Sequence, residues 1–97
     1  MKYIYCKWIH RHPIEPVDLY SELDDGRFET RKVEVFRDGT MGFADSTRSA
    51  GTTRLGDAPV PSVQEIGASS EFMPREIEAA EFEAVWVRAI KSRQDEA

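Results

Sequence analysis

The segment Tyr20–Gly39, YSELDDGRFETRKVEVFRDG, decides the fold because it holds two turn signals with a charged, strand-like run between them. The signals are Asp25-Gly26 and Asp38-Gly39. Asp-Gly favours a two-residue hairpin turn of type I′, in which both central residues have positive φ. The segment therefore predicts a strand on each side of Asp25-Gly26 and a second hairpin at Asp38-Gly39.

The two strands of the first hairpin differ in how regularly they alternate. Residues 17–24 alternate cleanly, as a half-buried strand does. The apolar side chains of one face are Val17, Leu19 and Leu23. In residues 27–37, however, Phe28 is at an even position and Val33 at an odd one, so on a regular strand they would point to opposite faces. We expect a one-residue bulge near Arg31-Lys32 to restore a common inner face.

Three further patterns lie outside this hairpin. Residues 2–11 carry apolar or aromatic side chains on both faces, which indicates an interior strand with something covering each side. Ser62-Val63-Gln64-Glu65 is a capping-box pattern and predicts the start of a helix. A last helix is predicted by one apolar stripe. Its members are Phe82, Val85, Trp86, Ala89 and Ile90.

Together these patterns predict a single α+β domain over residues 1–97. Its elements are strands at about 2–11, 17–24, 27–37 and 41–44, a polar loop at 45–61, and helices at about 62–68 and 78–92. We expect an antiparallel sheet of about four strands, with one short and one longer C-terminal helix packed on one face.

Composition and charge narrow the classes of function. The chain has 97 residues, of which 40% are hydrophobic and 32% charged, as in a globular domain. Its formal net charge of −5 disfavours nucleic acid, because affinity for nucleic acid grows with the number of phosphates that the protein neutralises. A basic protein is the more natural partner for this acidic surface.

The sequence predicts a cytoplasmic protein. Its N-terminus, MKYIYCKWIH, lacks the apolar core and cleavage site of a signal peptide, and no run is long enough for a membrane helix. Cys6 is the single cysteine, so no intrachain disulfide is expected. It lies in mid-strand, where a buried and inert thiol is expected.

Neither a metal nor a cofactor is predicted. His10 and His12 share a strand face, and Glu15 is nearby, but a structural zinc site needs four ligands, usually with cysteine. The 45–61 loop lacks the lysine of a P-loop. We therefore expect no catalytic residue, and an enzyme is the least supported class.

Charged side chains of the hairpin give two alternative binding surfaces. The first is an acidic protein-binding surface made of Asp18, Tyr20, Glu22, Asp24 and Asp25. The second is a phosphate-binding patch made of Arg27, Arg31, Lys32, Arg37 and Arg54. The simplest interpretation of both sets is a solvated hairpin whose cross-strand ion pairs set its register.

Five strings spread along the chain resemble one protein family. They are WIH (Trp8–His10), Pro16, the hairpin segment quoted above, TRLGDAPVPSVQEI (Thr53–Ile66) and EFEAVW (Glu81–Trp86). The family consists of short bacterial proteins labelled as a domain of unknown function, number 6881. The resemblance implies a bacterial, cytosolic, stand-alone domain, and it implies no activity and no catalytic residue.

Three hypotheses follow. The leading one is a protein-binding module, of the inhibitor or immunity type, whose acidic surface meets a basic site on another protein. The alternative is a nucleotide- or nucleic-acid-binding domain that uses the arginine patch and the 45–61 loop. A small enzyme is the third.

Overall fold

The first hairpin forms the centre of the sheet in the computed structural model, which describes residues 1–94. Strand β2 (Pro16–Leu23) pairs with β3 (Glu29–Phe36), but the turn between them is longer than predicted. The Asp24 amide donates to the Phe28 carbonyl, and positive φ falls on Arg27 alone (67°) instead of on Asp25 and Gly26. The predicted type I′ turn is therefore wrong. The Asp24 carboxylate explains the change, because it accepts the amides of Gly26 and Phe28.

The second hairpin and the bulge are confirmed. Gly39 has a φ of 90° and its amide donates to the Phe36 carbonyl, which closes the turn into β4 (Met41–Asp45). The register shifts between Glu22, which pairs with Arg31, and Leu23, which pairs with Glu29. The residue left over is Thr30, directly beside the predicted position.

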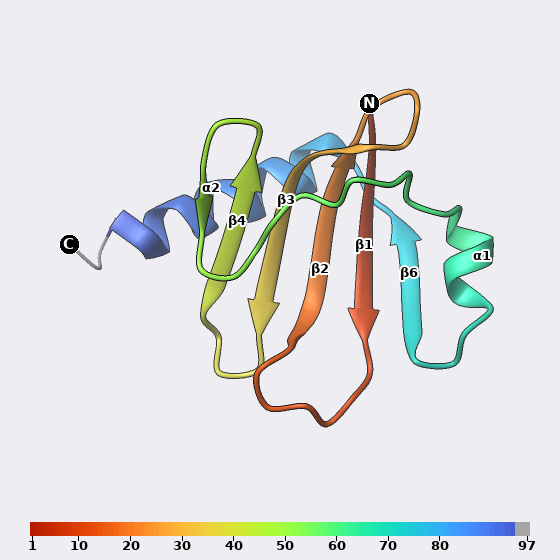
Figure 1. Cartoon of the computed structure of the whole chain (residues 1–97), viewed down its shortest axis with the longest axis horizontal. Coiled ribbons are helices and arrows are strands. Elements are labelled where there is room, and N and C mark those ends of the chain that lie inside the picture. The colour runs from red at the N-terminus through yellow and green to blue at the C-terminus, as the bar shows by residue number, and fades with distance from the viewer. Residues whose placement is uncertain (95–97) are drawn as a thin grey trace.

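The sheet has six strands, where about four were expected (Figure 1). Its order is β5-β4-β3-β2-β1-β6, and every neighbouring pair is antiparallel. The interior position expected for the first strand is confirmed, since β1 (Lys2–Trp8) lies between β2 and β6. The two strands that the sequence did not predict are the edges, β5 (Ser49–Ala50) and β6 (Phe72–Glu76).

Each missed edge strand has a plain reason. β5 has two residues within a polar loop, too few for an alternating pattern. β6 contains Pro74, which lacks an amide proton and is tolerated only at a sheet edge. A very short edge and an edge with proline both discourage further strand pairing.

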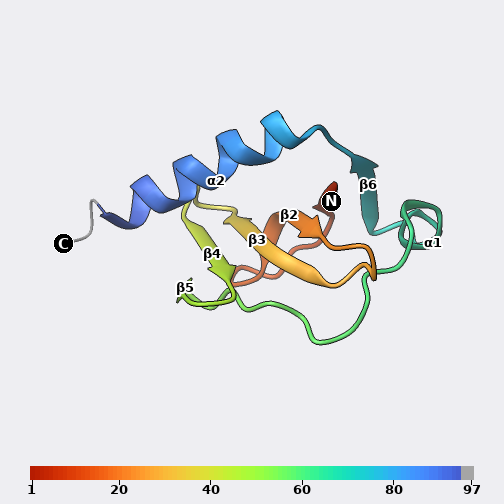
Figure 2. The ribbon, with the colours of Figure 1, turned by 90° about the horizontal axis from the view of Figure 1, so that it is seen from above.

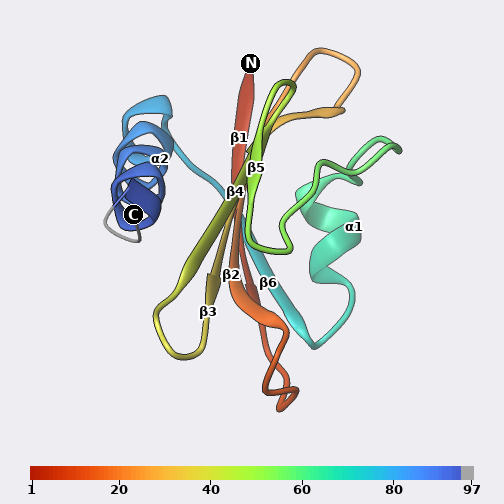
Figure 3. The same cartoon turned by 60° about the vertical axis from the view of Figure 1, so that its left-hand side comes forward.

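The two helices lie on opposite faces of the sheet, so the expectation that both pack on one face is wrong (Figure 3). Helix α1 (Val63–Gly67) precedes β6, and helix α2 (Ala79–Gln94) follows it. Because β6 is an edge strand, the chain passes around the sheet there and moves from one face to the other (Figure 2). The predicted capping box is present in α1, where Ser62 accepts from the Glu65 amide.

The larger core lies between the sheet and α2. The predicted stripe is confirmed, with four of its residues buried and Ile90 partly buried. They pack on three buried sheet residues, Val33, Met41 and Phe43. None of the helices in residues 1–94 has the length and apolar character needed to cross a membrane. The face opposite α2 carries the shorter helix and a long loop, and it holds the site described next.

Candidate functional site

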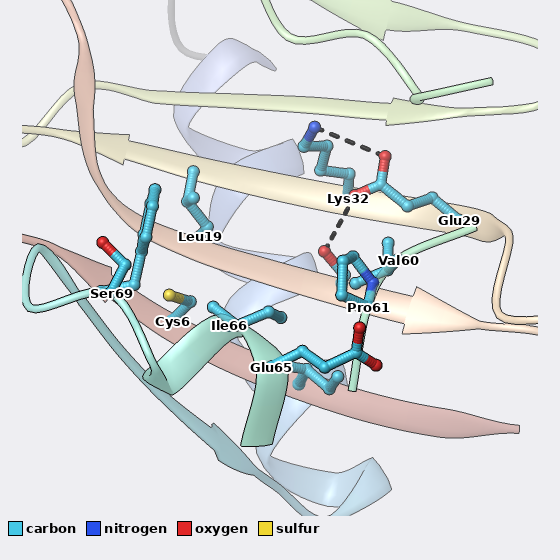
Figure 4. Close-up of a pocket in the computed structure, with 12 residues that line it drawn as sticks. Cys6, Leu19, Glu29, Lys32, Val60, Pro61, Glu65, Ile66 and Ser69 are labelled. Carbon is cyan, nitrogen blue, oxygen red and sulfur yellow. Dashed lines mark hydrogen bonds and ion pairs between the residues drawn. The ribbon is translucent and has the colours of Figure 1, made fainter. Parts of the chain in front are cut away.

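A pocket of about 380 Å³ lies on the sheet face opposite α2, between strands β1, β2, β3 and β6, helix α1 and the end of the long loop (Figure 4). Its apolar floor consists of Ile4, Cys6 and Leu19. Its apolar walls consist of Val60, Pro61, Ile66 and Phe72. The polar lining is Ser21, Glu29, Lys32, Glu65 and Ser69.

Strand alternation positions the floor. Ile4 pairs with Ser21, and Cys6 pairs with Leu19, so these four side chains share one face of the sheet. Ile4 and Cys6 are buried, at 4% and 7% exposure. Helix α1 is short and covers only part of this face, and the space beside it remains as the pocket.

The polar end of the pocket is built around Glu29. Its Oε1 accepts the Gly56 amide at 2.7 Å and lies 3.4 Å from the Lys32 ammonium. Its Oε2 accepts the Ser21 hydroxyl at 3.0 Å. Lys32 also donates to the Arg54 carbonyl at 3.3 Å. These contacts stabilise a carboxylate whose side chain is only 7% exposed, since a buried charge must be paired and hydrogen-bonded.

Arg27 fastens the loop that forms one wall. Its guanidinium donates to the carbonyls of Val60 and Pro61, each at 2.7 Å, and its own carbonyl accepts the Val60 amide at 2.8 Å. Arg27 has positive φ, a conformation that costs a non-glycine residue energy and persists only where the surroundings hold it. The hydrogen bonds from the Arg27 guanidinium to Val60 and Pro61, called the clasp below, supply that constraint.

Replacing Arg27 by glycine is therefore expected to loosen the wall without unfolding the protein. Glycine relieves the positive-φ strain by about 1 kcal/mol, which offsets much of the loss of two hydrogen bonds. We expect the Val60 amide to exchange with deuterium about tenfold faster, with the free energy of unfolding changed by less than about 1 kcal/mol.

Two controls accompany this measurement. Arg27→Asn also tolerates positive φ and lacks the clasp, so it should loosen Val60 in the same way. Arg37→Ala removes an exposed bond to the His10 carbonyl and should leave Val60 unaffected. Unchanged Val60 exchange in Arg27→Gly would show that the clasp does not hold the wall.

Cys6 contributes surface to the pocket and little reactivity. Burial raises the pKa of its thiol, which disfavours the nucleophilic thiolate. Its side chain lines the pocket, and Figure 4 shows its Sγ turned toward the side on which Ser69 lies. The side chain can therefore be enlarged toward open space.

Three residues of the predicted acidic surface face α2. Asp18 accepts the Tyr5 hydroxyl at 2.5 Å, and the Tyr20 ring lies 4.9 Å from the Tyr5 ring. Asp18 and burial both raise the pKa of Tyr20, burial being the larger cause. Glu22 is 6% exposed and is bound by Arg31, so it presents almost no acidic surface to a partner.

The other two residues of that set lie in the turn. The Asp24 carboxylate accepts two turn amides, and Asp25 is exposed. The five residues are therefore divided between the α2 face and the hairpin tip.

The five predicted basic residues are also divided. Lys32 lies at the polar end of the pocket and Arg27 at its wall, while Arg31 lies on the opposite face under α2. Arg37 donates to a carbonyl near the end of β1, and Arg54 to two carbonyls of its own loop. The structure brings only Arg27, Lys32 and Arg54 to one side of the sheet.

The histidine pair is held by backbone contacts. His10 Nε2 lies 2.7 Å from the Pro16 carbonyl, and His10 Nδ1 accepts the His12 amide at 3.0 Å. Within residues 1–94, no three side chains of the metal-binding types come together.

Sequence reasoning missed the pocket because its walls come from distant segments. One signal was present: residues 2–11 are apolar on both faces, which required a cover on the side away from α2. The pattern did not reveal that this cover is incomplete.

Comparison with known proteins identifies the family and no relative of known activity. Searches of curated proteins and of solved structures gave no match. The model of one family, described as Domain of unknown function (DUF6881), matches residues 2–91. The chain therefore belongs to the DUF6881 family.

Proposed function

We propose that this protein binds a small molecule in the pocket between its sheet, α1 and the Arg27-fastened loop. The observation that supports the proposal is the pocket itself, about 380 Å³ with apolar floor and walls and a few converging polar groups. Ligand sites have this size and composition, whereas protein cores are packed with few voids larger than a water molecule.

The polar groups also support binding. Burying a carboxylate and an ammonium next to an apolar cavity costs folding free energy unless the two charges are fully paired or bind a ligand. Glu29 and Lys32 form an ion pair with each other, and both side chains also line the cavity. Such a pair fixes the orientation of a ligand without needing to react with it.

Filling the pocket from its floor tests the proposal. Cys6→Leu adds apolar volume to a side chain that lines the pocket, so the fold should tolerate it. We expect compounds found in a thermal-shift screen of the wild-type protein to lose at least about tenfold in affinity for Cys6→Leu.

Cys6→Ala is the matched control, since it removes the same sulfur and leaves the pocket open. It should retain binding within about twofold, allowing for small losses of contact. Equal binding to the wild type and to Cys6→Leu would place the ligand elsewhere and contradict the proposal.

A second candidate function is protein binding on the other face. Met73 pairs with Lys7, and Lys7 pairs with Asp18, so the three side chains form a row across the sheet. Met73 is 58% exposed, which places an apolar group beside the acidic Asp18. Of the residues expected from the sequence to form an acidic surface, this candidate uses Asp18 and Tyr20.

This candidate is tested with a partner isolated by affinity capture and then purified. Asp18→Lys and Met73→Ala should each weaken its binding, and the salt dependence should change only in Asp18→Lys. Asp25→Lys, at the exposed hairpin tip, is the control. Binding unchanged in both variants would remove this face from consideration.

A further inference from the structure

The hydrogen-bonding groups at the polar end of the pocket reveal the class of ligand. This step rests on the proposed small-molecule binding and adds the chemistry of the molecule bound. The relevant side chains are Ser21, Glu29 and Lys32, and a Glu34 oxygen lies 4.0 Å from the Lys32 ammonium.

The donors at this end are already engaged. The Lys32 ammonium donates a hydrogen bond to the Arg54 carbonyl at 3.3 Å. It also forms ion pairs with Glu29 Oε1 at 3.4 Å and with Glu34 Oε2 at 4.0 Å. The Ser21 hydroxyl proton is donated to Glu29. A ligand that needs a donor from the protein would compete with the two carboxylates and the Arg54 carbonyl for the Lys32 ammonium.

Acceptor capacity, in contrast, remains. A carboxylate offers about four acceptor positions, and Glu29 uses three, for Gly56, Lys32 and Ser21. Ser21 Oγ accepts no hydrogen bond from any residue within 1–94, so its lone pairs are available beside the remaining position on Glu29 Oε2. Both residues line the pocket.

Charge favours the same kind of ligand. Three ionised side chains here are largely shielded from water: Lys32 at 19% exposure, Glu29 at 7% and Glu34 at 15%. Their sum is one negative charge. Glu65, which also lines the pocket, is acidic, while the cationic Arg27 guanidinium donates to the carbonyls of Val60 and Pro61. An anionic ligand would meet repulsion at short range, where screening by water is weak.

We propose that the pocket binds a small lipophilic molecule whose polar end is a hydrogen-bond donor, a primary amine in preference to an alcohol, and that it discriminates against carboxylates. The apolar body lies on Ile4 and Leu19 and against Phe72. The amine or hydroxyl donates to Ser21 Oγ and Glu29 Oε2.

Three probes of one shape test this assignment: phenethylamine, phenethyl alcohol and phenylacetate at pH 7, titrated into ¹⁵N-labelled protein. We expect shifts at the amides of the pocket residues, with phenethylamine binding about tenfold more tightly than phenylacetate and the alcohol in between. Tighter or equal binding of phenylacetate in the pocket would overturn the donor assignment and leave small-molecule binding standing.

Two serine variants locate the polar contact. Ser21→Ala should weaken phenethylamine about tenfold, because it removes the acceptor that lies beside Glu29. Ser69 also lines the pocket, and Ser69→Ala should change the affinity for phenethylamine less than twofold. Equal effects of the two variants would overturn the assigned contact. If none of the three probes shifted a pocket amide, the proposed small-molecule binding would itself fail.

Discussion

Replacing Arg31 by methionine is expected to lower the free energy of unfolding by about 3 kcal/mol at pH 7. Arg31 donates to both carboxylate oxygens of Glu22, from Nε at 2.8 Å and from an Nη at 2.6 Å, and it also pairs with Glu83 on α2. Glu22 is 6% exposed, so the variant leaves a nearly buried carboxylate with Thr30 and Tyr3 as its remaining partners.

Methionine is chosen because the Arg31 side chain has a second role. Its guanidinium carbon lies 5.0 Å from the centre of the Phe82 ring and 5.1 Å from that of Trp86. Methionine retains an apolar stem against these rings, so most of the loss reports the charge pair. Glu83→Gln is the control, since its half-exposed carboxylate should contribute less than about 1 kcal/mol.

The pH dependence separates charge from packing. Arg31 lowers the pKa of Glu22 in the folded protein. The stability that ionised Glu22 contributes to the wild type is therefore fully present above the pKa of Glu22 in the unfolded chain. It is lost as the pH falls through the pKa of Glu22 in the folded protein. In Arg31→Met the guanidinium, which lowers this pKa most, is absent, so the pKa of Glu22 is expected to rise and the variant loses less stability on protonation.

The deficit of the variant should consequently be largest at pH 7 and shrink as the pH falls through about 4. Urea unfolding of the wild type and Arg31→Met at pH 7 and at pH 4 measures this difference. A deficit independent of pH would mean that the loss comes from packing on Phe82 and Trp86.

Glu22 also shows where sequence reasoning stops. Alternation correctly placed Asp18, Tyr20 and Glu22 on one face of β2, and the pattern predicted that this face was exposed. Helix α2 instead packs on that side, and Arg31 neutralises Glu22 beneath it. A strand pattern states which side chains share a face, but the cover on each face depends on segments far away in the sequence.

Local sequence patterns predicted the features that depend on residues close together in the chain. The hairpins, the bulge and the capping box each depend on neighbouring residues, and each is present. Strand β6 depends on pairing with β1, more than sixty residues earlier in the chain, and its proline conceals it. Because β6 carries the chain around the sheet edge, missing it led to the expectation that both helices pack on one face, and it hid the pocket.

Phe82→Ala is expected to lower the free energy of unfolding by about 4 kcal/mol. Phe82 is fully buried, its ring lies 5.4 Å from that of Tyr3 and 6.3 Å from that of Trp86, and Arg31 covers it. Removing the ring leaves a cavity where α2 joins the sheet. Thermal and urea unfolding measure the loss, and Val87→Ala, on the exposed side of α2, should cost less than about 0.5 kcal/mol.

The same variant shows whether the two faces of the sheet act independently. Tyr3 contacts Phe82 on one face, while the next residue, Ile4, forms the floor of the pocket on the other. The pocket walls come from α1, β6 and the Arg27-fastened loop, none of which contacts Phe82 in the core cluster. Below its lowered melting temperature, Phe82→Ala should therefore bind phenethylamine within about threefold of the wild type. A larger loss would mean that packing under α2 sets the shape of the pocket through β1, and that the sheet transmits changes from one face to the other.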